Sequence, residues 1–276
     1  MLLKSDGASL YTTTDLATIV ERMKLFQPDE ILYVVDKRQE LHFDSGLPLR
    51  KKDRSCERRH KAFLPWLRYY EWKKMAKPFK TREGGVMRLK NLIADIDEEM
   101  FTKIVENRSV RDKDARDTAK IVGLAAIKYG DLSNQATKDY IFDVDRFTSF
   151  EGNTGPYILY TIVRIKSILN RYVEAGGNLE AGEILPASNG SEKNLMLQLS
   201  GFGSMIESAF EEKAPHKICA YIYEVSNAFN SFYHETKILS EENQAQKESY
   251  IRLLQLTKRV LETSIDLLGF EAPDKM

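Results

Sequence analysis

Long apolar repeats with the period of an α-helix dominate the second half of the sequence. From Asn91 onward, apolar residues recur every three or four positions, and hardly any stretch alternates as a strand does. One such repeat follows Pro156, a residue tolerated in a first helical turn because its missing N–H would have no partner there. The periodicity predicts helices over 92–107, 112–129, 155–173, 193–211, 216–236 and 243–268. We therefore expect the second half to be all-helical.

The start of the sequence has a different pattern. The stretch "TDLATIVERMKLF" (14–26) has apolar residues at helical spacing, with Thr14 or Asp15 placed to act as the N-cap. The stretch "EILYVVD" (30–36) has the composition of a buried strand. A helix followed by a buried strand predicts part of an open α/β sheet.

Composition places the chain among ordinary globular proteins. Its 276 residues are 42% hydrophobic and 30% charged, and we expect two domains of modest size. No apolar run reaches the ~18 residues of a membrane helix, and "MLLKSDGASLY" lacks the apolar core of a secretory signal. Cys56 and Cys219 form no metal-ligand spacing. We expect a cytoplasmic protein with no membrane contact and no metal site.

The balanced net charge conceals a local basic excess. Between Lys51 and Lys90 the sequence has 14 Lys or Arg against 4 Asp or Glu, whereas the rest has 27 against 37. An excess of this size attracts polyanions, although a solvated charged surface remains an equal alternative. Within it, Lys80, Thr81 and Arg82 precede the pair Gly84 and Gly85. A flexible loop of this kind can place donors around phosphate oxygens, or it can be only a basic turn.

The segment 128–171 contains "SFEGNTGPYILY" followed by a helical stretch bearing Arg164, and it closely resembles the domain junction of arginyl-tRNA synthetases. Three further stretches resemble the same family: "SDGASLYTTTDLA" with "ILYVVDKRQELHF", "KPFKTREGG", and "YIYEVSNAFNSFYHETKIL". They are similar to the second half of the catalytic fold, to its second class I signature loop and to the anticodon-binding domain, respectively.

This resemblance implies a fold and a division into domains. The fold is an α/β remnant, the second half of a class I nucleotide-binding catalytic domain, followed by an all-α anticodon-binding bundle. The implied partial catalytic domain covers 1–93, a helical connecting region covers 94–150, and the anticodon-binding domain covers 151–276.

The resemblance also assigns substrate-binding positions. Tyr11, Asp15 and Gln39 match the family's arginine-binding residues, and a carboxylate suits the charged fork of an arginine side chain. Tyr11 and Asp15 are spaced so that both can face one pocket, although Asp15 could instead only cap its helix. His42 matches a position near the ATP. ATP is then a substrate, accompanied by magnesium. The catalytic loop residues are Lys80, Thr81 and Arg82, of which Lys80 and Arg82 stabilise the leaving pyrophosphate.

The helical half is expected to bind tRNA. Arg164 and Lys166 are candidates for phosphate contacts, and exposed aromatic side chains can stack on unstacked bases at ~1–3 kcal/mol each. Aromatic residues at helical spacing are more often core, so each candidate remains open. The aromatic candidates are Tyr221, Tyr223, Phe229 and Tyr233.

Two features depart from the family pattern. The family's N-terminal domain and its His-Ile-Gly-His-type motif are not found in this sequence, so half of the ATP site is expected to be missing. The stretch 44–76 matches nothing in the family although both flanks match. Our hypothesis is that 44–76 is encoded out of frame, because a one-base shift of the codons for Tyr69 to Trp72 can spell Thr-Met-Asn-Gly. In that case much of the basic excess is accidental.

The sequence thus predicts a C-terminal portion of an arginine-tRNA ligase that binds the anticodon region of arginine tRNA but is inactive alone. Three alternatives remain. The chain is a stand-alone tRNA-binding module, or one half of a split synthetase whose N-terminal half is encoded separately, or a helical interaction protein or decaying pseudogene product without tRNA binding.

Overall fold

The computed structural model describes residues 4–29, 31, 88–107, 112–136, 138, 140 and 142–276. The chain divides into two compact units, Met1–Tyr69 with Ala136–Asp139, and Tyr70–Gln135 with Tyr140–Met276. The described part of the first unit contains helix α1 (Tyr11–Phe26). The second unit contains all the other described helices.

Helix α1 begins earlier than the sequence predicts. Its N-cap is Leu10, which offers no side-chain hydrogen bond, so the expectation that Thr14 or Asp15 caps the helix is wrong. Thr14 instead lies within the helix, and its hydroxyl donates to the Leu10 carbonyl. The described residues contain no strand, and the stretch expected to form one lies outside them except for Ile31. The α/β character of the first unit therefore stays a prediction.

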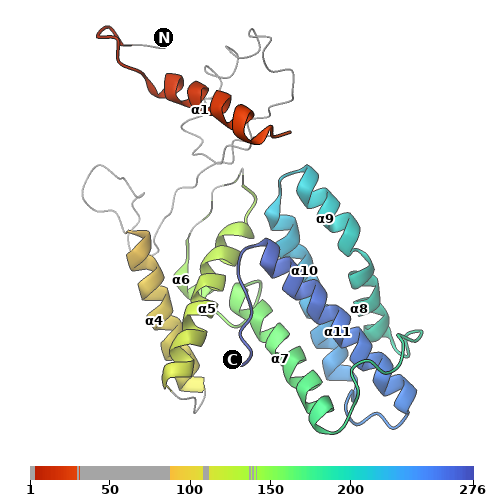
Figure 1. Cartoon of the computed structure of the whole chain (residues 1–276). Coiled ribbons are helices and arrows are strands. Elements are labelled where there is room, and N and C mark those ends of the chain that lie inside the picture. Colours follow the sequence, from red (N-terminus) through yellow and green to blue (C-terminus); the bar gives the residue numbers. More distant parts are fainter. Residues whose placement is uncertain are drawn as a thin grey trace. The chain divides into compact units, whose positions relative to one another are not determined.

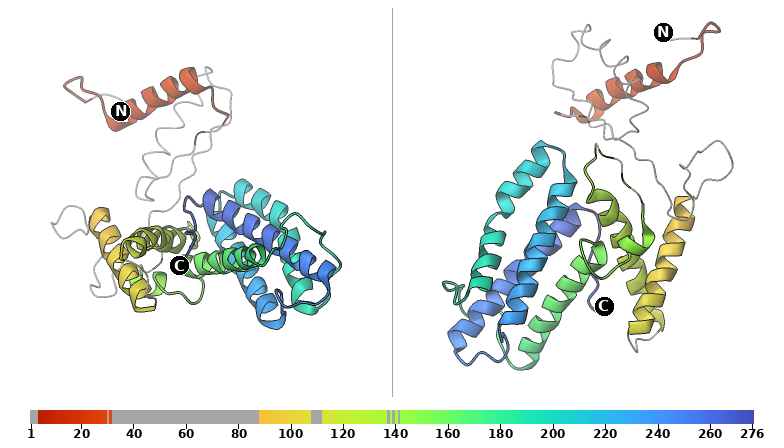
Figure 2. Two further views of the ribbon diagram at one scale, coloured as in Figure 1. Left: turned by 60° about the horizontal axis from the view of Figure 1, so that its bottom comes forward. Right: turned by 180° about the vertical axis from the view of Figure 1, so that it is seen from behind.

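The second unit is a set of packed helices (Figure 1). Helix α4 packs on α5 and α5 on α7, while α10 contacts α5, α7, α8, α9 and α11. The two further views also show α4 and α5 side by side (Figure 2). An all-helical second half is thus confirmed for the described residues. The helices are α4 (Leu89–Asn107), α5 (Asp112–Leu132), α6 (Val144–Phe147), α7 (Gly155–Glu174), α8 (Gly190–Ser200), α9 (Phe202–Glu211), α10 (Pro215–Glu235) and α11 (Gln244–Leu267).

The main difference from the predicted helices lies at Gly201. The range 193–211, expected to be one helix, is two helices, and Gly201 is both the C-cap of α8 and the N-cap of α9. The Gly201 N–H bonds the carbonyl of Gln198, three residues back, at 3.1 Å. A Ser-Gly pair such as Ser200 and Gly201 is a common site for a helix to bend, so the sequence did contain the signal.

One hydrophobic core connects these helices. Ile96 and Met100 of α4, Ile162 of α7 and Phe232 of α10 are fully buried members of the same cluster. Each lies on the apolar side of its helix, as helical periodicity requires. The core therefore fixes the side of each helix that remains outside, and so the position of the surface side chains.

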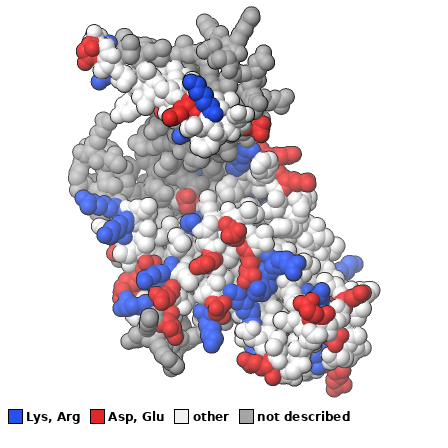
Figure 3. All heavy atoms as spheres, in the orientation of Figure 1, with Lys and Arg blue, Asp and Glu red and all other residues white. Residues whose placement is uncertain are grey.

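Charged residues are distributed unevenly along the sequence, whereas on the surface seen in Figure 3 the two signs are intermixed. From residue 91 onward the sequence has 21 Lys or Arg against 29 Asp or Glu. Acidic and basic side chains are interspersed over the helices in the view of Figure 3. The basic excess lies outside the described residues except at 88–90. Among the described residues, no helix is long and apolar enough to span a membrane.

Candidate nucleic-acid interface

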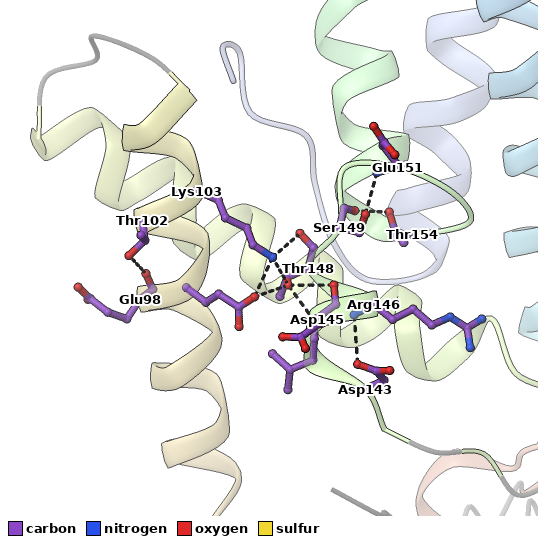
Figure 4. Close-up of polar contacts among 12 residues, drawn as sticks. Glu98, Thr102, Lys103, Asp143, Asp145, Arg146, Thr148, Ser149, Glu151 and Thr154 are labelled. Atoms are coloured by element: carbon purple, nitrogen blue, oxygen red, sulfur yellow. Dashed lines mark hydrogen bonds and ion pairs between the residues drawn. The ribbon is translucent and has the colours of Figure 1, made fainter. Parts of the chain in front are cut away.

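The loop that leads into α7, residues 148–154, is held in place by hydrogen bonds among its own polar groups. Thr154 is the N-cap: its hydroxyl accepts the Tyr157 N–H at 3.2 Å and donates to the Ser149 carbonyl at 2.6 Å. The Ser149 hydroxyl in turn accepts the Glu151 N–H at 3.1 Å, and Ser149, Glu151 and Thr154 lie together at the start of α7 (Figure 4). Side-chain acceptors satisfy backbone donors that a helix start leaves open. The first turns of α7 therefore have a defined position.

A charged pair fixes the other end of this loop. Lys103 of α4 donates to the hydroxyl of the buried Thr148 at 2.6 Å and pairs with Glu99 at 2.7 Å, and the Thr148 hydroxyl also donates to Glu99 (Figure 4). Burial tends to raise the pKa of Glu99, but the hydrogen bonds from Lys103 and Thr148 and the Lys103 charge bring it below its ordinary value. Helix α4 is thereby linked to the loop.

A third contact joins the loop to α5 and α10. The Tyr129 hydroxyl lies 2.5 Å from the Asn153 side-chain oxygen and 2.8 Å from the Cys219 carbonyl. Tyr129 is fully buried, and this burial raises the pKa of its hydroxyl well above the usual range. The hydroxyl therefore remains a hydrogen-bond donor at any physiological pH. The loop is held by three different helices.

Beside the loop lies a pocket of about 620 Å³. Helices α4, α7 and α10 and the loop all contribute to it. Tyr157, Tyr160 and Arg164 have the spacing of one helix face, which places all three on the pocket side of α7. The lining residues are Lys103, Ile104, Phe150, Glu151, Tyr157, Tyr160, Arg164, Asn230, His234 and Met276.

Arg164 occupies the centre of a polar and aromatic group in this pocket. Its guanidinium donates to the Asn230 side-chain oxygen at 2.6 Å and lies 4.8 and 5.1 Å from the ring centroids of Tyr160 and Tyr233. Asn230 also donates to the Tyr157 hydroxyl at 2.9 Å. A guanidinium has five N–H donors, so those not used by Asn230 can bind an acceptor from outside. The group is suited to a ligand with both aromatic faces and negatively charged oxygens.

Tyr157 is held in place by contacts with α10. Its hydroxyl donates to the Asn227 side-chain oxygen at 2.8 Å, and its ring packs against Tyr223 with 5.7 Å between centroids. Burial is the main reason why the pKa of Tyr157 is raised, while its hydrogen bond with Asn230 lowers it. Tyr157 therefore stays protonated and supports Asn230, which in turn orients Arg164.

The structure brings together three of the residues expected to bind tRNA. Arg164 lines the pocket, the Tyr233 ring lies against Arg164, and Tyr223 supports Tyr157. Phe229 is fully buried, so it is removed from the candidates for base stacking. Tyr221 is partly buried and donates to the Gln198 carbonyl at 3.0 Å, which indicates a structural role.

Lys166 does not join Arg164. Only 16% of its side chain is exposed, and its ammonium is surrounded by oxygens of α11 and of the segment that follows α11. In this arrangement the donors of Lys166 are directed at these oxygens, and a phosphate contact by Lys166 stays a prediction. Side chains two positions apart on a helix do not face the same way, which explains why Arg164 and Lys166 separate.

Of the ten residues that line the pocket, only Arg164 was a sequence candidate; the nine others include Tyr157, Tyr160, Asn230 and His234. Tyr157 and Tyr160 belong to the stretch "SFEGNTGPYILY", and their spacing with Arg164 was available as a signal. Asn230 and His234 are one turn apart on α10, but only the packing of α10 against α7 shows that they face Arg164.

The expected catalytic residues are mostly outside the described residues. Gln39, His42, Lys80, Thr81 and Arg82 all lie there. Tyr11 is the first residue of α1 and is 86% exposed, and Asp15 follows one turn later on the same helix. Among the described residues, no three His, Cys, Asp or Glu side chains are grouped so as to hold a metal ion.

Comparison with known proteins divides the chain into two matched regions. Residues 1–144 match the catalytic domain of the class I (R) tRNA synthetases, and residues 158–276 match the DALR anticodon binding domain. The chain belongs to the arginyl-tRNA synthetase family. The arginine-tRNA ligases of Agathobacter rectalis and Alkaliphilus oremlandii are 58% and 52% identical to it. Each comparison covers 100% of this chain and 47% of the relative.

A solved structure supports the same arginyl-tRNA synthetase architecture. The arginyl-tRNA synthetase of Thermus thermophilus matches with a TM-score of 0.82 at 23% identity, over 100% of this chain and 50% of that one. The chain thus spans about half the length of the family relatives that it matches. The pocket spans the two matched regions, because Lys103 and Ile104 lie in the catalytic-domain match and Arg164, Asn230 and Met276 in the anticodon-domain match.

Proposed function

We propose that this chain is the part of an arginine-tRNA ligase that binds the anticodon region of an arginine tRNA, and that the Arg164 pocket is its binding site. The observation that carries the proposal is that the Arg164 guanidinium, which lines a pocket, lies 4.8 Å from the Tyr160 ring centroid and 5.1 Å from that of Tyr233. Half of the residues that line this pocket, among them Arg164 and Tyr160, lie within the region matched by the anticodon binding domain.

The chemistry of the pocket fits a single-stranded RNA loop. Unstacked bases stack on aromatic rings and guanidinium planes, and phosphates accept hydrogen bonds from arginine and lysine. Tyr160 is 37% exposed, so its ring is accessible to a base, and His234 lines the same pocket as Arg164. Because the sequence from residue 91 onward has more acidic than basic residues, specific local contacts rather than a broad positive surface would have to provide the affinity.

The test compares tRNA binding by the full chain and by two variants. We expect Arg164→Met and Tyr160→Ala to weaken binding of arginine tRNA by about tenfold or more, the loss typical of one central contact or one stacked base. Arg171→Met is the matched control, because Arg171 lies on the same helix, is exposed and bonds only locally to Ser167. Equal affinities for all four proteins would refute the pocket as the binding site.

The catalytic assignment is proposed on the family resemblance. Tyr11, Asp15 and Gln39 would bind the arginine substrate, and His42, Lys80 and Arg82 would contact ATP, which enters such reactions with magnesium. Thr81 would act with Lys80 and Arg82 in catalysis. The expected reaction is ATP-dependent activation of arginine, followed by its transfer to the tRNA. Lys80 and Arg82 would stabilise the pyrophosphate as it leaves.

Aminoacylation assays separate the three functional alternatives. Arginine transfer to tRNA is measured with the chain alone and with a separate polypeptide that supplies the first half of a class I catalytic domain. Turnover only in the mixture identifies a split synthetase with a separate N-terminal half. Salt-dependent tRNA binding without pyrophosphate exchange in either assay identifies a stand-alone binding module. Failure to bind tRNA at all favours an interaction protein.

A further inference from the structure

Lys166 of α7 contacts four oxygen atoms. Its Nζ lies 3.3 Å from the carbonyl oxygens of both Ala272 and Pro273, 3.4 Å from a carboxylate oxygen of Asp274, and 3.5 Å from one of Glu262. An ammonium group has three N–H donors, so these acceptors use all of them. With 16% of its side chain exposed, Lys166 is a structural contact rather than a surface charge.

Three of these oxygens belong to one segment, residues 269–276, which follows α11. The same segment is held at its start by Lys128 of α5, whose ammonium donates to the Gly269 carbonyl. Phe270 and Met276 are 5% and 6% exposed and belong to the hydrophobic core. The segment is therefore attached by one lysine at its start, by another near its middle, and by burial at its end.

The end of the segment forms part of the Arg164 pocket. Met276 lines this pocket together with Arg164 and His234. A methionine side chain is long and flexible, so its position depends on how the backbone before it is held. Lys166 contacts that backbone at the carbonyl oxygens of Ala272 and Pro273, and also contacts the Asp274 carboxylate.

We propose that Lys166 is a positioning residue: it holds the 269–276 segment in place so that Met276 forms a wall of the Arg164 pocket. The position of the segment follows from these contacts of Lys166 and Lys128. The effect of Lys166 on RNA binding rests on the proposed function. Without the Lys166 ammonium, three oxygens of the segment lose their donor and the segment loses its attachment to α7. The wall of the pocket then moves although Lys166 itself does not face the pocket.

The first measurement follows Met276 without any RNA. The full chain is labelled with ¹³C at the methionine methyl groups, and the Met276 signal is assigned with Met276→Leu. We expect Lys166→Leu to shift and sharpen this signal, while the signal of Met196 on α8 stays unchanged and reports an intact fold. Lys166→Arg should restore most of the original shift, since a guanidinium can donate to the same oxygens. An unchanged Met276 signal in Lys166→Leu would overturn the proposal.

The second measurement is a double-mutant cycle on tRNA affinity. Lys166→Leu and Met276→Ala should each weaken binding by roughly tenfold, and the double variant should be no weaker than either alone, because both remove the same wall. The salt dependence of binding should be unchanged in Lys166→Leu. If Lys166 contacted a phosphate instead, the two losses would multiply and the salt slope would fall by about 0.7 to 0.9. Lys120→Leu, exposed on α5, is the control for a lost surface charge.

The two measurements distinguish failure of this inference from failure of the proposed function. A shifted Met276 signal with no change in tRNA affinity in any variant keeps Lys166 as the residue that positions the segment, but removes the pocket as an RNA site. If the losses of tRNA affinity in Lys166→Leu and Met276→Ala multiply in the double variant and the Met276 signal does not shift, the pocket remains an RNA site and the positioning role of Lys166 is rejected.

Discussion

Glu99 is a charged side chain whose environment makes the stability of the second unit depend on pH. Because Lys103 and Thr148 lower its pKa in the folded state, the charged form is favoured by folding. This stabilisation is complete above the ordinary glutamate value of about 4.5 and disappears as the pH falls through the lower folded pKa. We expect Glu99→Gln to lower the free energy of unfolding by about 0.5–1 kcal/mol at pH 7 and by almost nothing at pH 3, as measured by urea unfolding.

The neighbouring residue provides the control for this prediction. Glu98 pairs with Arg116 at 3.3 Å, but the two side chains are 66% and 57% exposed, so the pair is largely screened by water. Glu98→Gln should therefore change the unfolding free energy by less than Glu99→Gln at pH 7. An equal effect of the two substitutions, or a Glu99→Gln effect that persists at pH 3, would contradict the assigned role of the Lys103 and Thr148 contacts.

Single residues of the pocket could be predicted only in part. Arg164 was a candidate through the family resemblance, and the structure places it in the pocket. Phe229 and Tyr233 looked equivalent in sequence, yet Phe229 is fully buried and Tyr233 lies against Arg164. Helical periodicity gives the side of a helix on which a residue lies. The periodicity does not show which neighbouring helix covers that side. Only the packing of the helices therefore shows which of these aromatic side chains is buried.

The contact between α5 and α7 depends on a position without a side chain. A Cβ atom on Gly155 would lie 2.4 Å from the Ala125 carbonyl oxygen and 2.6 Å from the Ala125 carbonyl carbon. These are backbone atoms of α5, which cannot move without displacing the helix. We expect Gly155→Ala to lower the free energy of unfolding by about 1–3 kcal/mol and to lower the melting temperature by several degrees.

Gly203 of α9 is the matched control for Gly155. A Cβ atom at Gly203 would have no other atom within 4 Å. Since alanine is the better helix former, Gly203→Ala should leave stability unchanged or raise it by up to about 1 kcal/mol. Differential scanning calorimetry of both variants checks the pair. Similar melting temperatures for Gly155→Ala and Gly203→Ala would show that α7 can move away from α5 at no cost.

Whole elements were easier to predict than their contacts. The ranges 155–173, 216–236 and 243–268 agree with α7, α10 and α11 to within one residue at each end. Their ends carry readable local signals: Pro156 in the first turn of α7 and Pro215 in that of α10. The N-cap of α1 was predicted wrongly because Thr14 and Asp15 are favoured cap residues in general, while Leu10 caps this helix only with its backbone.

At the scale of the molecule, the described residues of the main hydrophobic cluster belong to the second unit. Every residue of the main hydrophobic cluster, including its partly buried neighbours, lies at or beyond Leu92 among the described residues. Helix α4 completes this core from one side, because Ile96, Met100 and Ile104 are buried in it. A core of this extent would let the helical unit fold without the residues that precede it.

We therefore predict that a fragment beginning at Arg88 folds on its own. Its far-ultraviolet circular dichroism should show helix, its thermal unfolding should be a single cooperative transition, and it should bind arginine tRNA with the affinity of the full chain.

A second fragment that begins at Asp112 lacks α4 and leaves Ala115, Ala119 and Val122 of α5 uncovered, all of which are buried in the full chain. It should melt at a lower temperature and bind more of a hydrophobic dye. A broad, gradual transition of the longer fragment would show that the residues before Arg88 contribute to the core, and equal melting temperatures of the two fragments would show that α4 does not.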